Sequence, residues 1–363
     1  MRILYGVQAT GQGHISRARA MAKALADSDV QITWLFSGRP REKLFEMQAF
    51  ADFEHRTGLS FATRDGGIDY LKTLTGNRFG RFIRDARALD LSPFDLIVSD
   101  FEPVTAWAAR LAGRRVIGIG HQYAFGEHTP IASGSWWSRL IMRNFAPVDT
   151  PVGLHWHPYA ENVLPPILDL PALTTQGGEH TLVYLPFEDQ DTVTRWLQQF
   201  PRHSFVQYAA GINDEQRGNV RRHRANVSGF KQHLASSAGV ICNSGFELIS
   251  ECLHWGKPVL TKPLAGQMEQ LSNALSLEQL GYATVAPGLC SQTLHRWLLS
   301  SRSIKPMAYP NVARCLADWL AGGCADSPAQ LCRRLWLPGL LGAGKQAESN
   351  QCNRHTLEGA ITR

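Results

Sequence analysis

Short apolar runs alternate along most of the chain with longer segments whose apolar residues recur at helical spacing. The first run, residues 3–7, precedes the polar stretch QATGQGH and a segment with Ile15, Ala18, Ala22 and Leu25 on one helical face. Further apolar runs predict strands at 31–36, 95–99, 115–119, 181–185, 204–208, 239–242 and 258–261. Helices are predicted from about residue 103 and at 190–200, 246–255, 269–280 and 310–320. Strands alternating with helices of this length are typical of parallel sheets in α/β layers.

Two interruptions of this pattern divide the chain. Between residues 146 and 178 the sequence is rich in proline and leads into TTQGGEH, which we interpret as a domain junction. We therefore expect one α/β domain over 1–160, a second over 161–325, and a basic, poorly periodic tail over 326–363; a length of 363 residues fits two domains. Within 53–70, the pair Gly66-Gly67 between apolar runs predicts a hairpin.

Composition narrows the classes of function. Apolar residues make up 44% and charged residues 19%, so the chain can bury a large core. The net charge of +6 suits an anionic ligand or an acidic membrane surface, but no dense basic patch with interleaved aromatics indicates nucleic acid. No apolar run approaches the ~20 residues of a membrane-spanning helix, and the N-terminus lacks the form of a signal peptide. All seven cysteines lie in the second half without a C-x-x-C pair, which favours free thiols and a cytoplasmic protein over disulfides or a zinc site.

The stretch TGQGHISRAR, residues 10–19, lies between the first strand and the first helix. It differs from a dinucleotide-binding fingerprint because Ser16 stands at the third glycine and the second strand ends in FSG, without an acid for a ribose. The sequence therefore disfavours NAD as a ligand of this loop. His14 follows Gly13 at the lip of the sheet, where an imidazole can act as general base on a hydroxyl; local packing of the ring is the alternative.

A second stretch, residues 244–274, contains SGFELISE and a polar loop AGQMEQ. Ser244-Gly245 leaves the first amides of the following helix bare, which is a site for a diphosphate. Glu251 lies about one and a half turns later, within reach of a ribose. The alternative is an amphipathic surface helix with solvated Glu247 and Glu251.

As a whole this stretch resembles the donor signature of GT-B glycosyltransferases, in the order Gly245, Glu251, Gly256-Lys257-Pro258, Glu269-Gln270 and Asn273-Ala274. It is similar to the lipid-linked GlcNAc transferase of peptidoglycan synthesis. It is more similar to an uncharacterised microbial group of the same superfamily, which shares G-x-G-H, SDFEP at 99–103 and the pair His121-Gln122. The resemblance covers residues 1–320. Leu248 replaces the Ser or Thr that many members carry three residues before the glutamate, so Ser244 or backbone amides would have to contact phosphate.

The resemblance implies two Rossmann-like domains that face each other across a cleft, the first for an acceptor and the second for a nucleotide-diphospho-sugar, with UDP as the expected nucleotide. His14 would be the base, Asp100 would orient it, and Gly13, Glu102 and His121 would contact the acceptor; an Asp100 that merely caps the helix near residue 103 is the alternative. The expected donor residues are Ser244, Gly245, Phe246, Glu251, Gln267, Glu269 and Gln270.

The implied reaction is an inverting displacement that needs neither a metal nor a resident cofactor. A lipid-linked acceptor and a polysaccharide acceptor are both compatible with this reaction. The protein would then contact the inner face of a membrane peripherally. A nucleotide-sugar hydrolase or epimerase and a non-catalytic nucleotide-sugar-binding protein stay open as alternatives.

Three further motifs give weaker evidence of function. Asp189-Gln190-Asp191 has a metal-binding D-x-D form, but two acids at a helix start are more typical of caps. WWSRLIMRNF, residues 136–145, fits either a membrane contact or core packing. LGAGKQ, residues 341–346, lacks the spacing of a P-loop.

Overall fold

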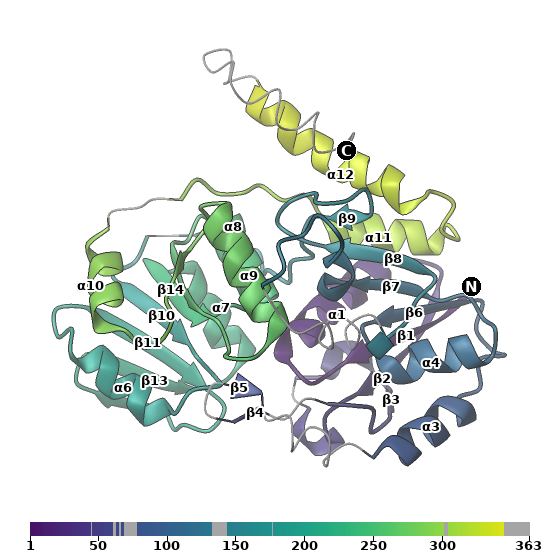
Figure 1. Ribbon diagram of the computed structural model, residues 1–363, viewed down its shortest axis with the longest axis horizontal. Coiled ribbons are helices and arrows are strands. Elements are labelled where there is room, and N and C mark those ends of the chain that lie inside the picture. The colour runs from purple at the N-terminus through teal and green to yellow at the C-terminus, as the bar shows by residue number, and fades with distance from the viewer. Residues whose placement is uncertain are drawn as a thin grey trace.

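In the computed structural model, two α/β units lie side by side, each built around a seven-stranded sheet (Figure 1). The structure describes residues 1–44, 46–60, 63–64, 67–68, 78–132, 144–175, 177–300 and 304–344. We call the sheet within residues 2–164 and its covering helices the N-terminal half, and the sheet within residues 180–285 and its helices the C-terminal half. The predicted α/β class with parallel sheets is confirmed.

The sheet of the N-terminal half has the order β3-β2-β1-β6-β7-β8-β9, and all of its neighbours are parallel. Its strands are β1 (Arg2–Gln8), β2 (Gln31–Ser37), β3 (Glu54–His55), β6 (Leu96–Asp100), β7 (Ile117–Gly120), β8 (Thr150–Leu154) and β9 (Val163–Leu164). Alternate residues of β1 enter different cores: Ile3 and Tyr5 pack on the side of α1, whereas Leu4 packs with Val104 of α4. Since all strands point the same way, the residues after β1, β6 and β7 meet at one edge.

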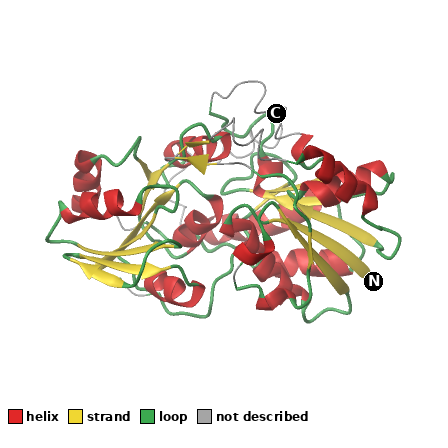
Figure 2. Cartoon of the chain, turned by 90° about the horizontal axis from the view of Figure 1, so that it is seen from below, coloured by secondary structure: helices red, strands yellow, loops and turns green. Residues whose placement is uncertain are grey.

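Helices cover both faces of this sheet, as the view in Figure 2 also shows. They are α1 (Gln12–Leu25), α3 (Phe79–Ala88) and α4 (Pro103–Leu111), with short 3₁₀ helices η1 (Arg41–Lys43), η2 (Gln48–Phe50) and η3 (His121–Ala124). The predicted hairpin is present as β4 (Thr63–Arg64) and β5 (Gly67–Ile68), which pair antiparallel. Proline opens α4 at the first helical position, where its missing amide proton is not needed.

The sheet of the C-terminal half has the order β12-β13-β11-β10-β14-β15-β16. Its strands are β10 (His180–Tyr184), β11 (Ser204–Ala209), β12 (Glu215–Arg217), β13 (Val220–Arg224), β14 (Gly239–Asn243), β15 (Val259–Lys262) and β16 (Thr284–Val285). The helices are α6 (Gln190–Gln198), α7 (Val227–Ala235), α8 (Phe246–His254), α9 (Met268–Gln279) and α10 (Ser291–Leu299). The antiparallel pair β12–β13 was not predicted, because this edge ribbon is mostly charged and lacks an apolar run.

The proline-rich segment 146–178 is more than a junction, since it contains β8 and β9. β9 is the last strand of the first sheet and lies beyond residue 160, where the boundary was expected. β8 pairs with β9, and both strands place buried apolar residues in the core: Val152, Leu154, Val163 and Leu164. The prolines of this segment obscure that apolar pattern in the sequence.

The end of the described chain returns to the N-terminal half (Figure 1). Helix α11 (Val312–Ala321) packs on α1, and α12 (Pro328–Gly344) packs on β9. Residues 328–344 therefore form a helix, where a poorly periodic tail was expected. The helix is held because Leu331 and Leu335 are buried and Trp336 Nε1 donates to the carbonyl of Val163 at 2.7 Å.

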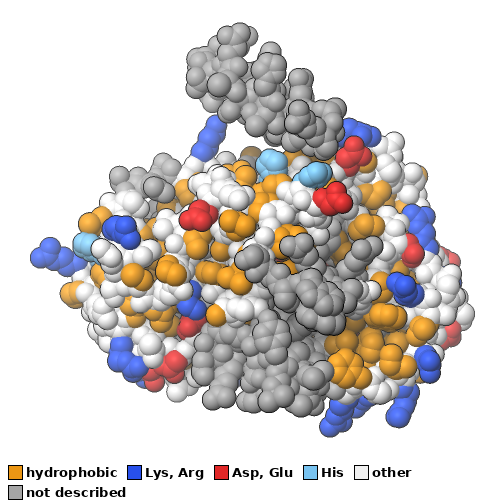
Figure 3. Space-filling view, viewed as in Figure 1, with side chains coloured by type: hydrophobic (Ala, Val, Ile, Leu, Met, Phe, Trp, Pro, Cys, Tyr) orange, Lys and Arg blue, Asp and Glu red, His pale blue; other side chains and the backbone are white. Residues whose placement is uncertain are grey.

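Two further features concern the surface charge and the length and polarity of the helices. On the face shown in Figure 3, basic side chains lie mostly around the rim. Among the described residues, every helix is too short or too polar to cross a bilayer.

Candidate active site

A cavity of about 550 Å³ lies where the carboxyl ends of both sheets face each other. The N-terminal half contributes the loop after β1 and the start of α1, including Gly13 and His14. The C-terminal half contributes the start of α8 and the loop before α9. The two stretches that the sequence analysis singled out therefore line one space.

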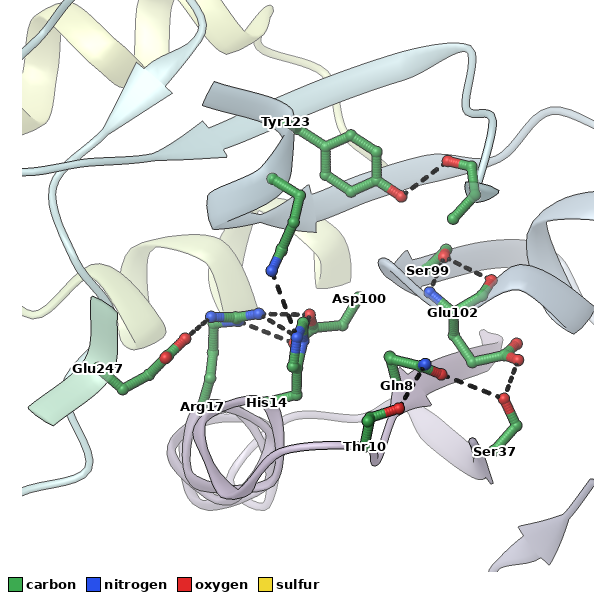
Figure 4. Close-up of polar contacts among 12 residues, drawn as sticks. Gln8, Thr10, His14, Arg17, Ser37, Ser99, Asp100, Glu102, Tyr123 and Glu247 are labelled. Carbon is green, nitrogen blue, oxygen red and sulfur yellow. Dashed lines mark hydrogen bonds and ion pairs between the residues drawn. The ribbon is translucent and has the colours of Figure 1, made fainter. Parts of the chain in front are cut away.

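His14 lies in the first turn of α1, which begins after Gly11 without a side-chain cap. Its Nδ1 lies 2.7 Å from Asp100 Oδ1, and its Nε2 lies 3.4 Å from the amide nitrogen of Gln122 (Figure 4). The ionised carboxylate of Asp100 only accepts, so we assign the proton to Nδ1; Arg17 Nη2 also lies 2.9 Å from Nδ1, and it donates to the same carboxylate oxygen. The amide donor of Gln122 then faces the lone pair on Nε2. This tautomer suits an imidazole that takes a proton from a ligand in the cavity.

Asp100 ends β6 and is fully buried. Burial alone would raise the pKa of this carboxyl, but the charges of Arg17 and His14 and their hydrogen bonds hold it below its ordinary value. The carboxylate therefore stays ionised beside the imidazole. The structure brings Asp100 to His14 and not to the start of α4, so the capping alternative is wrong.

Arg17 was not identified from the sequence. It lies one turn after His14 on α1, is almost fully buried, and donates from Nε and Nη2 to the two oxygens of Asp100 at 2.8 and 2.5 Å. Its Nη1 pairs with Glu247 Oε1, which comes from α8 across the cavity (Figure 4). The interpretation of Glu247 as a solvated surface acid is therefore wrong.

Glu102 does not line the cavity, contrary to expectation. Its buried carboxylate caps α4 by accepting from the amides of Val104 and Thr105 at 2.8 and 2.6 Å, and it also accepts from Ser37 Oγ at 2.5 Å. Burial raises the pKa of Glu102, while these hydrogen bonds oppose the shift. The conformation of SDFEP places Asp100 behind His14, without lining the cavity, and Glu102 in the helix cap.

His121 is also misplaced by the sequence analysis, because its ring is fully buried behind the cavity. It stacks on Phe246 with centroids 4.0 Å apart, and its nitrogens lie 2.8 and 2.7 Å from the carbonyl of Leu154 and from Asn273 Oδ1. Its neighbour Gln122 lines the cavity instead. Of the pair His121-Gln122, His121 therefore contacts the C-terminal half and Gln122 lines the cavity.

At the start of α8, Gly245 is the N-cap and no side chain caps the helix, so its first amides are available to a ligand. Gly245 and Phe246 line the cavity. The Ser244 hydroxyl does not, because it is buried in a hydrogen bond of 2.9 Å with Thr261 Oγ1. A phosphate contact through that hydroxyl is therefore excluded in this arrangement, and the backbone amides are left for that task.

Glu251 lines the cavity and pairs with Lys231 of α7, which the sequence analysis missed. Burial raises the pKa of the Glu251 carboxyl, while the charge and hydrogen bond of Lys231 oppose this and favour the ionised form. A carboxylate held in this way is an acceptor for ribose hydroxyls.

The loop before α9 brings Gln267, Glu269 and Gln270 to the cavity, as expected from its sequence. Gln267 caps α9 by accepting from the amide of Gln270 at 3.1 Å, and the Gln270 side chain accepts from the amide of Leu264 at 2.9 Å. Glu269 Oε2 accepts from Gln122 Nε2 at 2.9 Å, so this loop also contacts the N-terminal half beside His14.

The model of a protein family described as "Glycosyl transferase family 1" matches residues 1–300. The chain belongs to this family. Glycosyl transfer is therefore its class of reaction, and a comparison with curated proteins found no match.

Solved structures similar to this family 1 glycosyltransferase include three glycosyltransferases of bacteria. SnogD from Streptomyces nogalater is 17% identical, with a TM-score of 0.53 over 93% of this chain and 99% of that one. MurG from Acinetobacter baumannii is 15% identical, with a TM-score of 0.53 over 89% and 98%. SsfS6 from Streptomyces sp. SF2575, solved with thymidine diphosphate, is 14% identical, with a TM-score of 0.55 over 93% and 99%. These likenesses establish the GT-B fold.

Of the weaker motifs, Asp189-Gln190-Asp191 lies away from the cavity of the glycosyltransferase, whereas Phe145, the last residue of WWSRLIMRNF, is buried and is one of the residues that line it. Asp189 caps α6 by accepting from the amide of Thr192, and Asp191 pairs with Arg217 and Arg222. No cluster of three or more metal-ligating side chains occurs among the described residues. Residues 136–143 of the WWSRLIMRNF stretch and residues 345–346 of LGAGKQ lie outside the described part of the chain.

Proposed function

We propose that this glycosyltransferase moves a sugar from a UDP-linked donor to an acceptor hydroxyl by direct displacement with inversion. One observation carries the proposal: an oriented imidazole, His14, and an uncapped helix start beside a carboxylate, Glu251, line a single cavity from opposite halves. The thymidine diphosphate in the SsfS6 structure supports a nucleoside diphosphate as the donor's nucleotide part.

In the proposed reaction, the donor's diphosphate lies on the first amides of α8 and its ribose bonds to Glu251. Gln267, Glu269 and Gln270 surround the sugar. His14 Nε2 takes the proton of the acceptor hydroxyl while the hydroxyl oxygen bonds to the anomeric carbon. The bond from that carbon to the diphosphate oxygen breaks, and the leaving diphosphate takes the electron pair.

The charge that develops on the leaving diphosphate is stabilised by groups fixed in advance. The bare amides at Phe246 and Glu247 point out of the N-terminus of α8, where the helix dipole favours an anion. The Glu247 carboxylate would oppose this, but Arg17 pairs with it. We therefore propose that the reaction proceeds without a metal.

Calorimetric titration of UDP, GDP, dTDP and CMP tests the donor site. We expect one nucleoside diphosphate to bind and Glu251→Gln to weaken it by about 1.5–3 kcal/mol, the range for a hydrogen bond to a charged group. Glu278→Gln, an exposed glutamate of α9, is the control and should bind as the wild type does. Failure of all four to bind, or an effect of Glu251→Gln below a few tenths of a kcal/mol, contradicts the assignment.

Turnover separates transfer from other activities of this fold. With the nucleotide chosen by titration, we expect its release from the matching nucleotide sugar to be slow alone and to accelerate with acceptor. Release of free sugar at the full rate without acceptor would identify a hydrolase. Tight binding without turnover under any condition would identify a nucleotide-sugar sensor.

A further inference from the structure

Among the described residues, three cationic side chains line the cavity, and they differ in what neutralises them. Arg19 Nε donates to Asp169 at 3.0 Å, and Lys231 pairs with Glu251. Arg39 also lines the cavity, but it forms no ion pair with any carboxylate in the described part of the chain. Arg39 is therefore the cavity-lining cation whose charge is free for a ligand.

The backbone fixes Arg39 at the edge of the cavity. Strand β2 ends at Ser37, and Gly38 follows with φ of 91°, in the left-handed region that favours glycine. The Arg39 carbonyl accepts from His55 Nε2 at 2.8 Å, and Arg39 Nη2 donates to the carbonyl of Thr10 at 2.5 Å. The Thr10 carbonyl is the one hydrogen-bond partner of this side chain among the described residues, so most of its five N–H donors are available to a ligand.

An unpaired cation in a partly buried position is unfavourable unless an anion binds to it. Burial lowers the pKa of the Arg39 guanidinium, and among the described groups only the phenol of Tyr184 opposes the shift. Burial raises the pKa of that phenol, so it stays neutral beside the cation. Arginine itself remains charged in proteins, and its planar donors match the oxygens of phosphate. The expected ligand group is therefore an anion, with phosphate as the best match.

Tyr184 also indicates which part of the cavity Arg39 faces. It ends β10 of the C-terminal half, where it pairs in register with Cys242 of β14. Helix α8 begins shortly after Cys242, at Gly245, with the uncapped amides that we assign to the diphosphate. Arg39 thus lies beside the strand end that adjoins the start of the donor helix.

Two further observations place Arg39 on the donor side. The segment after it contacts the C-terminal half, since Glu46 Oε1 accepts from the amide of Val227 at the start of α7. In the sheet order β3-β2-β1-β6-β7, Arg39 follows β2 and Gln122 follows β7, so they lie on opposite sides of β1, which His14 follows. The acceptor hydroxyl assigned to His14 Nε2 faces Gln122. The anion beside Arg39 therefore belongs to the donor.

We propose that Arg39 is a further catalytic residue, which binds the donor's diphosphate from the N-terminal half and stabilises the charge that the diphosphate gains in the reaction. The bond between the anomeric carbon and the diphosphate oxygen breaks with both electrons on that oxygen, so the diphosphate gains one negative charge. A cation fixed beside it stabilises this charge more strongly in the transition state than in the bound donor. This inference rests on the proposed donor site at α8.

Calorimetry with three probes tests the assignment: the nucleoside diphosphate selected by titration, its nucleoside, and inorganic pyrophosphate. We expect Arg39→Gln to weaken the nucleoside diphosphate and pyrophosphate by about 10- to 150-fold, the range for a hydrogen bond to a charged group, and to change the nucleoside by less than about twofold. Unchanged nucleoside binding also shows that the variant is folded. Glu251→Gln should weaken the nucleoside and leave pyrophosphate unchanged, because its carboxylate is assigned to the ribose.

Matched variants separate the charge of Arg39 from its packing. Arg41→Gln makes the same change at an exposed arginine of the same segment, outside the cavity, and should bind all three probes as the wild type does. Arg39→Lys keeps a cation without the planar donors and should recover part of the affinity that Arg39→Gln loses. The proposal is overturned if Arg39→Gln binds the nucleoside diphosphate and pyrophosphate as tightly as the wild type does.

Rates show whether Arg39 acts in the reaction as well as in binding. At saturating donor, Arg39→Gln should lower kcat by about 10²- to 10³-fold, the usual loss when one group that stabilises a developing anion is removed. An unchanged kcat would overturn the catalytic role. Unchanged diphosphate binding with a raised KM for the acceptor would assign the anion to the acceptor and overturn the proposal as well.

The probes also separate this inference from the proposed function. Pyrophosphate that binds the wild type and not Arg39→Gln, in a protein that binds no nucleoside diphosphate, would contradict the proposed function and support the anion site at Arg39. Nucleoside diphosphate that depends on Glu251 and not on Arg39 would contradict this inference alone. A wild type that binds none of the three probes would contradict both.

Discussion

His14 depends on neighbours that are remote in sequence. Asp100 orients its ring, Gln122 faces its second nitrogen, and Arg17 holds Asp100 in place. Motif spacing identified His14 and Asp100, since each follows a strand at the same edge of a parallel sheet. It could not identify Arg17, because a buried arginine has no local signal and its partners lie 83 and 230 residues away.

At the scale of single residues, replacing His14 tests its proposed role as the base. We expect His14→Ala to lower kcat by about 10²- to 10⁴-fold, the usual contribution of general base catalysis, while the Kd of the nucleotide changes less than about twofold. Steady-state rates and calorimetry on the same preparations measure the two quantities. His128→Ala, an exposed histidine in the loop after η3, is the matched control. Undiminished turnover in His14→Ala would assign the base elsewhere.

At the scale of elements, helix starts decide which polar residues are available to a ligand. α8 begins at Gly245 without a side-chain cap, whereas α4 begins at Glu102 with two amides satisfied by its carboxylate. In the sequence, both helix starts show acids or small residues at a strand-to-helix turn. The difference lies in the backbone: Phe101, with φ of 51°, is one of the few non-glycine residues in the left-handed region, and it directly precedes the capping residue.

The cap predicts a structural phenotype for Glu102. Glu102→Ala should lower the free energy of unfolding by about 1–2 kcal/mol, the usual loss of a helix cap, since Val104 and Thr105 lose their acceptor. Nucleotide affinity should stay near that of the wild type. Urea unfolding and calorimetry measure both, with the exposed Glu127→Ala as control. Full stability combined with a raised KM for the acceptor would restore the binding role that the sequence suggested.

At the scale of the whole molecule, the two halves meet through buried polar and aromatic contacts behind the cavity. His121 bonds to Asn273, and Trp156 Nε1 donates to Ser250 Oγ at 2.8 Å. His155 is fully buried against these rings, and burial, followed by the charges of His121 and His157, lowers its pKa well below the ordinary 6.5. This interface therefore contains a histidine that the folded protein keeps neutral.

Protonation of His155 should weaken the fold. The unfolded chain binds this proton near pH 6.5 and the folded protein does so only at much lower pH. The stability is therefore complete above about pH 6.5 and falls below it, by at most about 1.4 kcal/mol per pH unit. His155→Phe should reduce that slope between pH 7.5 and 5.5, measured by urea unfolding, with His128→Phe as control. Equal slopes in wild type and His155→Phe would show that His155 does not titrate with unfolding.

The arrangement of two halves around a cleft was predictable from sequence, because strand and helix periodicity and the resemblance in residues 244–274 agree. The return of α11 and α12 to the first half was not, since it rests on long-range contacts such as those of Leu331 and Trp336 with β9. Lys231 was missed for the same reason: its partner Glu251 lies on another helix.

The most direct test of the account is a crystal structure with the bound nucleoside diphosphate. We predict the diphosphate on the amides at the start of α8 and the ribose hydroxyls on Glu251, with the phosphate end toward His14. A nucleotide bound elsewhere, or one with its ribose away from Glu251, would contradict the donor site and with it the proposed reaction.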